Sequence, residues 1–203
     1  MTDKKNVVFF DIDTQFDFIS PKGALYVKGA EKFVKNLKKL VDYARKNKIT
    51  VVATTDAHIP DDPEFKEFPP HCVFGTPGQE KVDETRQKEP FIIEMGHKGK
   101  IPLDRREYLI RKRTYGQTDP FFNNPKADEL LNGLKNSKKS KAIVFGIATD
   151  YCVKTAVDGL FNRGWQVFLV TDAIKEISKD EAKKLFDGWA KRGVKLVKTK
   201  DVI

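Results

Sequence analysis

Residues 142–161 read AIVFGIATDYCVKTAVDGLF, and this stretch decides the class of fold. Its first part, Ala142 to Ile147, is the continuous apolar run expected of a strand buried on both faces of a sheet. Apolar residues then recur at helical spacing, at Val153, Ala156, Val157, Leu160 and Phe161. The sequence therefore predicts a strand, a tight turn and a helix in succession, with Thr149 or Asp150 near the helix cap.

The same alternation continues on both sides of this stretch. Apolar runs predict strands at 7–10, 49–55, 91–94, 108–112, 166–170 and 194–197, and apolar stripes predict helices at 33–44, 124–134 and 178–189. Alternating strands and helices imply a parallel sheet that is covered by helices on both faces. We therefore predict an α/β fold, a three-layer αβα arrangement with a mostly parallel central sheet. We expect a single domain over residues 1–203, with an irregular excursion at about 80–106 that lies over the functional site.

Composition excludes several classes of protein. No apolar run approaches the roughly 18 residues of a membrane-spanning helix, and the apolar run that begins at Val7 is too short for a signal peptide. We therefore expect a cytoplasmic protein with no membrane partner. The net charge of +9 invites a nucleic-acid interpretation, but the lysines are scattered and no basic motif interleaved with aromatic residues accompanies them. We expect no nucleic-acid partner. The two cysteines, Cys72 and Cys152, are expected to be reduced thiols.

Ligands of such sheets bind beyond the carboxyl ends of the strands, so polar residues directly after strands are the candidates for function. Cys152 falls in the first turn of its helix, where the helix dipole and free backbone N–H groups favour an ionised thiol and can hold an oxyanion. It is a candidate nucleophile, and a small buried apolar cysteine is the alternative. Asp13 closely follows the first strand, near Asp11 and Asp17, and one of these acids is a candidate general base. Turn capping is the alternative role for them.

Two further groups of polar residues follow strands. Asp56 and His58 follow the second strand, and His71 comes from the next loop with Glu64 nearby. One carboxylate with two imidazoles suits zinc, iron or manganese, with Glu64 as an additional ligand, although polar loop residues are the alternative. Lys112 ends a later strand, where its charge would favour a thiolate close by. The alternative is that Lys112 is an exposed cation at the surface.

Together these segments resemble the isochorismatase-like cysteine hydrolases, and specifically their nicotinamidase branch. The resemblance rests on four motifs in the family's order: DTQFDF at 13–18, Asp56-x-His58, FPPHCVFGTPG at 68–78 and GIATDYCV at 146–153. The motifs span nearly the whole chain. The family motif usually carries Trp between the metal-binding Asp and His, and this chain has Ala57 there.

The resemblance implies a role for each matched residue. Cys152 would attack an amide carbonyl, Asp13 would take the thiol proton and return it to leaving ammonia, and Lys112 would support both. The backbone N–H groups of Ala148 and Cys152 would form the oxyanion hole, with a cis peptide between Ile147 and Ala148. A divalent metal, most often zinc, would be held by Asp56, His58 and His71, with Glu64 as a further ligand. Phe18 and Phe68 would sandwich the substrate ring, next to Tyr151.

The expected reaction is hydrolysis of nicotinamide to nicotinate and ammonia through a thioester, a step of NAD salvage. The expected partner is a small-molecule amide, and the expected assembly is a homo-oligomer. Another small amide as substrate and a non-catalytic scaffold are alternatives. A haloacid-dehalogenase-type phosphatase is suggested by Asp11-x-Asp13, although Gln15 stands where that motif needs Thr or Val, and Asp172 lacks an acidic partner.

Overall fold

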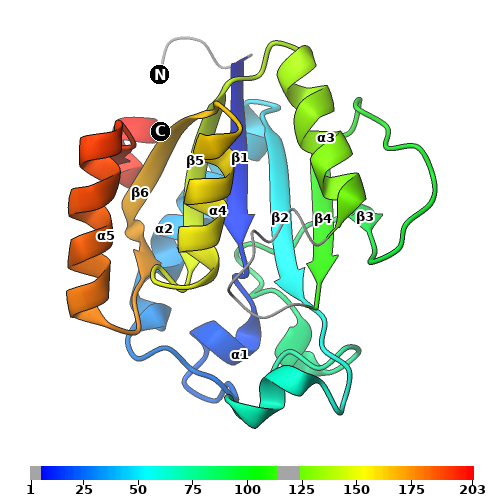
Figure 1. The fold of residues 1–203 in the computed structure, drawn as a ribbon, viewed down its shortest axis with the longest axis vertical. Coiled ribbons are helices and arrows are strands. Elements are labelled where there is room, and N and C mark those ends of the chain that lie inside the picture. The colour runs from blue at the N-terminus through cyan, green and yellow to red at the C-terminus, as the bar shows by residue number, and fades with distance from the viewer. Residues whose placement is uncertain (1–5, 114–123) are drawn as a thin grey trace.

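The computed structural model of the protein describes residues 6–113 and 124–203, and its strands form one seven-stranded sheet (Figure 1). The strands are β1 (Val7–Ile12), β2 (Thr50–Asp56), β3 (Phe91–Ile93), β4 (Glu107–Lys112), β5 (Lys141–Ile147), β6 (Gln166–Lys175) and β7 (Lys195–Val197). Their order in the sheet is β3-β4-β2-β1-β5-β6-β7, and every neighbouring pair is parallel. The predicted fold class is confirmed.

Helices cover both faces of this sheet, as Figure 1 shows. On one face lie α3 (Pro125–Asn136), α4 (Cys152–Asn162) and α5 (Lys179–Arg192), whose apolar stripes share a core with alternate residues of the central strands. On the other face lie α2 (Val34–Lys46) and the short α6 (Thr199–Val202). The remaining helical turns are α1 (Phe16–Ile19), η2 (Ala30–Phe33), η3 (Pro63–Lys66) and η4 (Pro77–Gln79).

Two predicted elements differ from the structure. The expected irregular excursion at 80–106 contains the strand predicted at 91–94, because β3 forms the edge of the sheet there and pairs with β4. Strand β6 continues to Lys175, five residues beyond the predicted end at 170. A register shift between Val144 and Gly146 keeps the later part of β6 paired with β5, so that Thr171 and Asp172 lie within the strand. Asp172 remains satisfied because its carboxylate accepts hydrogen bonds from Thr199.

The direction of winding changes between β1 and β5, which are neighbours in the sheet. The chain leaves β1 for α2 on one face and leaves β5 for α4 on the other, so a crevice opens beyond their carboxyl ends. Gly146 permits the close approach of these two strands, since a Cβ at this position would lie 2.0 Å from the carbonyl oxygen of Ile12. Its φ of +129° is also one that L side chains rarely adopt. Both Asp13 and Cys152 follow strands that border this crevice.

None of the helices in the described ranges combines the length and the apolar character that crossing a bilayer requires.

Candidate active site

Cys152 is the first residue of α4, so its predicted place in the first turn of a helix is confirmed. The N-cap is Tyr151, not Thr149 or Asp150. Asp150 does not cap α4 because its carboxylate accepts the backbone N–H groups of Ile177 and Ser178, at 3.0 and 2.7 Å. As the first residue of the helix, Cys152 has a backbone N–H with no intrahelical acceptor. The expected cis peptide between Ile147 and Ala148 is present.

Lys112, Asp13 and Cys152 come from three different strand ends and meet at one point. The Nζ atom of Lys112 lies 2.9 Å from Oδ2 of Asp13 and 3.6 Å from Sγ of Cys152. The Cys152 sulfur and a carboxylate oxygen of Asp13 lie within 4.8 Å of each other. Lys112 also forms an ion pair with Asp56. Lys112 and Asp13 are almost fully buried, so the surface-cation interpretation of Lys112 is wrong.

Asp13 is oriented by a residue that the sequence analysis did not single out. The Thr54 hydroxyl donates a 2.7 Å hydrogen bond to Oδ1 of Asp13, which leaves Oδ2 on the side of Lys112. The backbone carbonyl of Thr54 also accepts the backbone N–H of Asp13. Thr54 lies two residues before Asp56 on the same strand and therefore on the same face. That spacing is the signal by which the sequence could have identified it.

The electrostatics of this cluster favour a protonated resting thiol. Burial raises the pKa of the Cys152 thiol well above its ordinary value, and a hydrogen bond to Asp13 acts in the same direction, while Lys112 opposes them. The prediction of an ionised thiol is therefore wrong, because the desolvation that raises the thiol pKa outweighs the nearby cation that lowers it. Burial alone would lower the pKa of Lys112, but Asp13 and Asp56 raise it well above its ordinary value. Lys112 is thus a permanent cation beside a neutral thiol.

The predicted metal ligands also converge. Ligand atoms of Asp56, His58 and His71 all lie within 4.8 Å of one another. Nε2 of His58 is 4.0 Å from Asp56 Oδ1 and 3.7 Å from Glu64 Oε2, and Nε2 of His71 is 3.6 Å from Glu64 Oε1. Ligands of a tetrahedral zinc ion at about 2.1 Å are separated by about 3.4 Å, so these four residues fit one such ion with small adjustments.

The surroundings of the two histidines leave an Nε2 atom of each free for a metal. Nδ1 of His71 lies 2.8 Å from the carbonyl oxygen of Pro69, an acceptor that makes Nδ1 the protonated nitrogen. Nδ1 of His58 lies 3.1 Å from a carboxylate oxygen of Asp62. Both ring nitrogens of His58 are buried and make no hydrogen bond to any described residue, so the contact with Asp62 is close but is not a hydrogen bond. Asp62, which the sequence analysis did not single out, thus places a carboxylate beside Nδ1 of His58, where outer-shell carboxylates of metal-ligand histidines lie.

Protonation states agree with this arrangement. Burial lowers the pKa of His71, so its ring is neutral near pH 7 and can donate a lone pair. Burial, followed by the charge of Asp56, raises the pKa of Glu64 to about 7. A nearby cation would favour the ionised form of Glu64. Burial and neighbouring carboxylates thus raise the pKa of Glu64, and the positive charge of a divalent metal would offset that effect.

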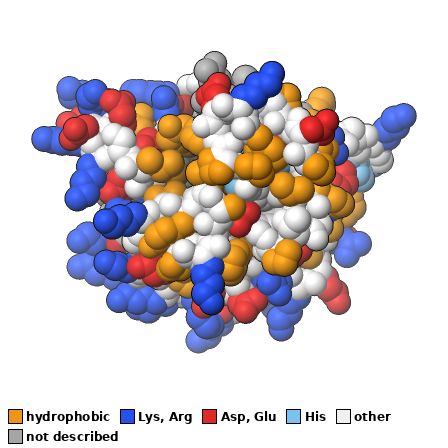
Figure 2. Space-filling model, turned by 90° about the horizontal axis from the view of Figure 1, so that it is seen from below, with side chains coloured by type: hydrophobic (Ala, Val, Ile, Leu, Met, Phe, Trp, Pro, Cys, Tyr) orange, Lys and Arg blue, Asp and Glu red, His pale blue; other side chains and the backbone are white. Residues whose placement is uncertain are grey.

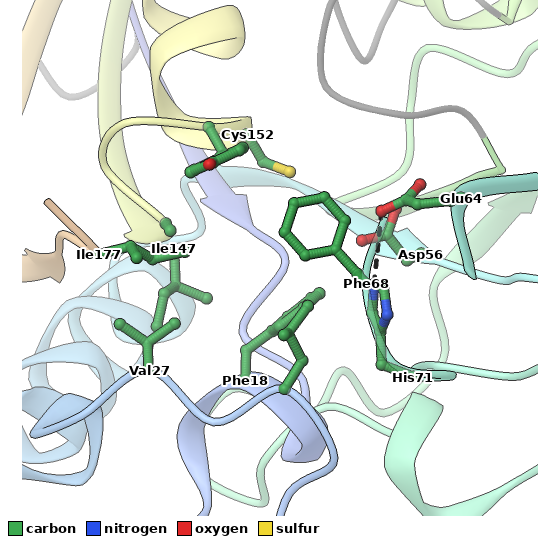
Figure 3. A pocket seen from close by; sticks show the side chains of 12 residues that line it. Phe18, Val27, Asp56, Glu64, Phe68, His71, Ile147, Cys152 and Ile177 are labelled. Carbon is green, nitrogen blue, oxygen red and sulfur yellow. Dashed lines mark ion pairs between the residues drawn. The ribbon is translucent and has the colours of Figure 1, made fainter. Parts of the chain in front are cut away.

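One pocket connects the cysteine to the metal-ligand cluster (Figure 3). Figure 3 shows the Cys152 sulfur on one side and Asp56, Glu64 and His71 on the other. The predicted substrate-binding residues Phe18, Phe68 and Tyr151 all line this pocket, together with Leu25, Val27, Ile147, Ala148 and Ile177. Figure 2 shows hydrophobic side chains around a hollow on this face of the molecule, with Lys and Arg mostly at its periphery. The pocket suits a small, flat and uncharged molecule.

The two other acids near Asp13 have structural partners. Asp11 is fully buried, lies 3.0 Å from Nζ of Lys81 and accepts a hydrogen bond from Thr14. Asp17 accepts the backbone N–H groups of Ala24 and Cys72. Asp17 therefore has a structural role, but its partners lie 7 and 55 residues along the chain and not in its own turn, so it is not the predicted turn cap. Because Asp11 pairs with Lys81, the Asp11-x-Asp13 motif of a phosphatase is not assembled here.

A family model described as the isochorismatase domain matches residues 7–201. Nicotinamidase of Escherichia coli (strain K12) is 26% identical over 188 residues, which cover 82% of this chain and 82% of the relative. Nicotinamidase/pyrazinamidase of Mycobacterium tuberculosis (strain ATCC 25618 / H37Rv) is 28% identical over 201 residues, which cover 92% of this chain and 95% of the relative. The crystal structure of pyrazinamidase of Pyrococcus horikoshii in complex with zinc superposes with a TM-score of 0.75 at 25% identity, covering 95% of this chain and 99% of that one.

Proposed function

Since the chain belongs to the isochorismatase family and is an amide-bond hydrolase, we propose that it hydrolyses nicotinamide to nicotinate and ammonia with Cys152 as the nucleophile. One observation carries the proposal: the Lys112 ammonium touches Asp13, Asp56 and Cys152 at once and so joins a nucleophile to a metal-ligand cluster. An aromatic-lined pocket spans both. A flat heteroaromatic amide fits this arrangement, with its ring among the aromatic side chains and its carboxamide at the sulfur.

Catalysis begins from the neutral thiol. Asp13 accepts the thiol proton as the sulfur attacks the amide carbonyl carbon, because a base at hydrogen-bond distance is what a thiol of raised pKa requires. Lys112 stays charged and stabilises the carboxylate and the developing thiolate. The backbone N–H groups of Ala148 and Cys152 donate to the oxyanion of the tetrahedral intermediate.

The second half of the reaction reuses Asp13. It returns the proton to the amide nitrogen as the C–N bond breaks, so that ammonia leaves and a thioester remains on Cys152. Asp13 then takes a proton from water as the water attacks the thioester, and it returns this proton to the Cys152 sulfur as the C–S bond breaks. The acid that is released ionises to nicotinate, and both the neutral thiol and the Asp13 carboxylate are restored. Fixed charges and donors in a buried site supply the stabilisation without reorganising during the reaction.

Asp56, His58, His71 and Glu64 would hold the metal, most often zinc in the branch that the chain resembles. When bound, the metal supplies a Lewis-acidic contact for the pyridine nitrogen of the substrate. The chain's own residues supply the remaining contacts, with Phe18 and Phe68 on the ring.

Ammonia release from a panel of amides tests the proposal. The zinc-loaded protein should release ammonia from nicotinamide and pyrazinamide, and only slowly from benzamide, which lacks the ring nitrogen. Cys152→Ala and Asp13→Ala should each abolish turnover, while Cys72→Ala, which removes the other thiol, should keep it. Turnover of other amides but not of nicotinamide would contradict nicotinamide as the substrate and leave the amide-hydrolysis mechanism standing. Full activity of both Cys152→Ala and Asp13→Ala would contradict the mechanism.

A further inference from the structure

We propose that Gln15 is a positioning residue that fixes the metal ligand Asp56 and ties it to the loop that carries His71. The inference rests on the proposed metal site and extends it. Gln15 is fully buried, two residues after Asp13. Its side-chain Oε1 accepts the backbone N–H of Asp56 at 2.8 Å, and its Nε2 donates to the backbone carbonyl of Asp56 at 2.9 Å. The side-chain amide of Gln15 therefore forms hydrogen bonds to both polar backbone atoms of Asp56.

The sheet topology explains why a side chain must form these two hydrogen bonds. Strands β1 and β2 pair in register as far as Ile12 and Thr54. Asp13 then adopts a φ of +47° and turns the chain away, so β1 offers no backbone partner for Asp56. The N–H and C=O of Asp56 face that side, because the other edge of β2 is held by Ala57 N–H donating to the Lys112 carbonyl. The Gln15 amide takes the place of the missing peptide group and sets the direction of the Asp56 side chain.

The remaining hydrogen bond of Gln15 reaches the other metal ligands. Nε2 also donates to the carbonyl of Gln79 at 2.7 Å, and the Gln79 side chain accepts the N–H of Gly75 at 3.0 Å. The segment from His71 to Gln79 is in turn joined to His58, whose N–H donates to the Cys72 carbonyl at 3.1 Å. Gln15 thus links the strand end that carries Asp56 to the loop that supplies His71.

A purely structural role is the competing explanation, and the chain offers a matched control. Gln87 is also buried, and its Nε2 donates to the backbone carbonyl of Tyr108 at 3.1 Å. Its contacts lie outside the metal-ligand cluster. Gln15→Met and Gln87→Met each replace a buried amide by an apolar side chain of similar size. Both should lower the free energy of unfolding, so a loss of stability alone does not separate the two roles.

Metal binding separates them. Zinc affinity of the chelator-treated full chain is measured by competition with a chromophoric chelator, and the cobalt-substituted protein is examined by its visible absorption spectrum. Gln15→Met should lower zinc affinity about 10- to 100-fold, the loss typical of outer-shell partners, and should change the cobalt spectrum. Gln87→Met should leave both unchanged. In the nicotinamide assay, Gln15→Met should lower kcat at saturating zinc, whereas Gln87→Met should not.

A second variant covers the case in which Gln15→Met does not fold. Gln15→Glu keeps an oxygen for the Asp56 N–H but removes both donors, and it should also lower zinc affinity and alter the cobalt spectrum. Folded Gln15 variants with wild-type affinity and spectrum would overturn the inference and leave the proposed metal site standing. Equal losses in Gln87→Met would overturn it as well. Failure of the wild-type protein to bind zinc would remove the metal site and this inference together.

Discussion

At the scale of single residues, the active centre depends on side chains that need not touch the substrate. Thr54 hydrogen-bonds the carboxylate of Asp13, and Gln15 hydrogen-bonds the backbone N–H and carbonyl of Asp56. Asp62 lies 3.1 Å from Nδ1 of His58. Thr54 is the simplest case, because one hydroxyl fixes one carboxylate oxygen of the proposed base. Removing that hydroxyl should change the chemistry without changing the pocket.

Thr54→Val replaces this hydroxyl by a methyl group of similar size. We expect kcat for nicotinamide to fall about 10- to 100-fold, equivalent to the roughly 1.5–3 kcal/mol of a hydrogen bond to a charged group, because Asp13 loses its orientation. Thr55→Val is the matched control, since Thr55 is buried one residue later on the opposite face and its hydroxyl has no partner among the described residues. Equal kcat values for the two variants would contradict the role of Thr54.

The resting state of the nucleophile gives a second prediction at this scale. Burial raises the pKa of the Cys152 thiol, and only the thiolate is alkylated, so little reactive form exists at pH 7. Iodoacetamide should alkylate Cys152 of the metal-free protein more slowly than free cysteine at pH 7, with a rate that still rises above pH 9. Lys112→Met should move this rise to higher pH, because Lys112 is the group that lowers the pKa. Peptide mapping identifies Cys152 as the alkylated residue. An alkylation rate that already levels off below pH 7 would instead show a preformed thiolate.

At the scale of elements, caps and strand ends place the site. The sequence predicted Asn124 and Pro125 at the start of a helix, and Asn124 is the N-cap of α3, where its side chain accepts the N–H of Lys126 at 3.1 Å. Its Nδ2 also donates to the Glu94 carbonyl at 3.1 Å. Asn124 therefore joins α3 to the segment that follows the edge strand β3.

Asn124→Ala should lower the free energy of unfolding by about 1–2 kcal/mol, because it removes both the helix cap and a buried link to the Glu94 carbonyl. Urea-induced unfolding measures the change. Asn132→Ala, in the same helix, removes an exposed amide that donates to Asp128 at 3.3 Å and should have almost no effect. If both substitutions lower stability equally, the cap contributes nothing beyond helix propensity.

At the scale of the whole molecule, the metal-ligand cluster joins segments that are separate along the chain. Asp56 ends β2, His58 follows it, Glu64 lies in η3, and His71 lies beyond η3. An ion bound by all of them binds the folded chain far better than the unfolded chain. Ligand binding of this kind stabilises the native state by mass action.

Zinc should therefore raise the unfolding temperature of the chelator-treated protein. At about 1,000 times the dissociation constant the expected gain is about 4 kcal/mol. His71→Ala should abolish most of this shift because it removes one ligand. His97→Ala, which changes a histidine packed against Phe91 outside the cluster, should retain it. An equal shift in both variants would place zinc elsewhere on the protein.

Prediction from sequence succeeded where the signal is local or periodic. Buried parallel strands give continuous apolar runs, and the short loops after them mark the functional edge of the sheet, so Asp13, Asp56, Lys112 and Cys152 could be selected as candidates. The same reasoning missed Asp62 as a partner of His58, because it follows no strand directly and is one of several acidic residues in its loop. It also placed the end of β6 too early, because the polar residues there are satisfied by a distant segment.

The sequence by itself therefore determined the parallel αβα sheet and the set of residues available for chemistry, because periodicity and order along the chain encode both. Only the tertiary structure decided what those residues do to one another. The protonation of the Cys152 thiol depends on desolvation and on charges from other strands, and neither is visible in local sequence. Gln15 hydrogen-bonds the Asp56 backbone because β1 turns away at Asp13 while β2 continues to Asp56. That difference in where the two strands end matters only once they are paired in the sheet.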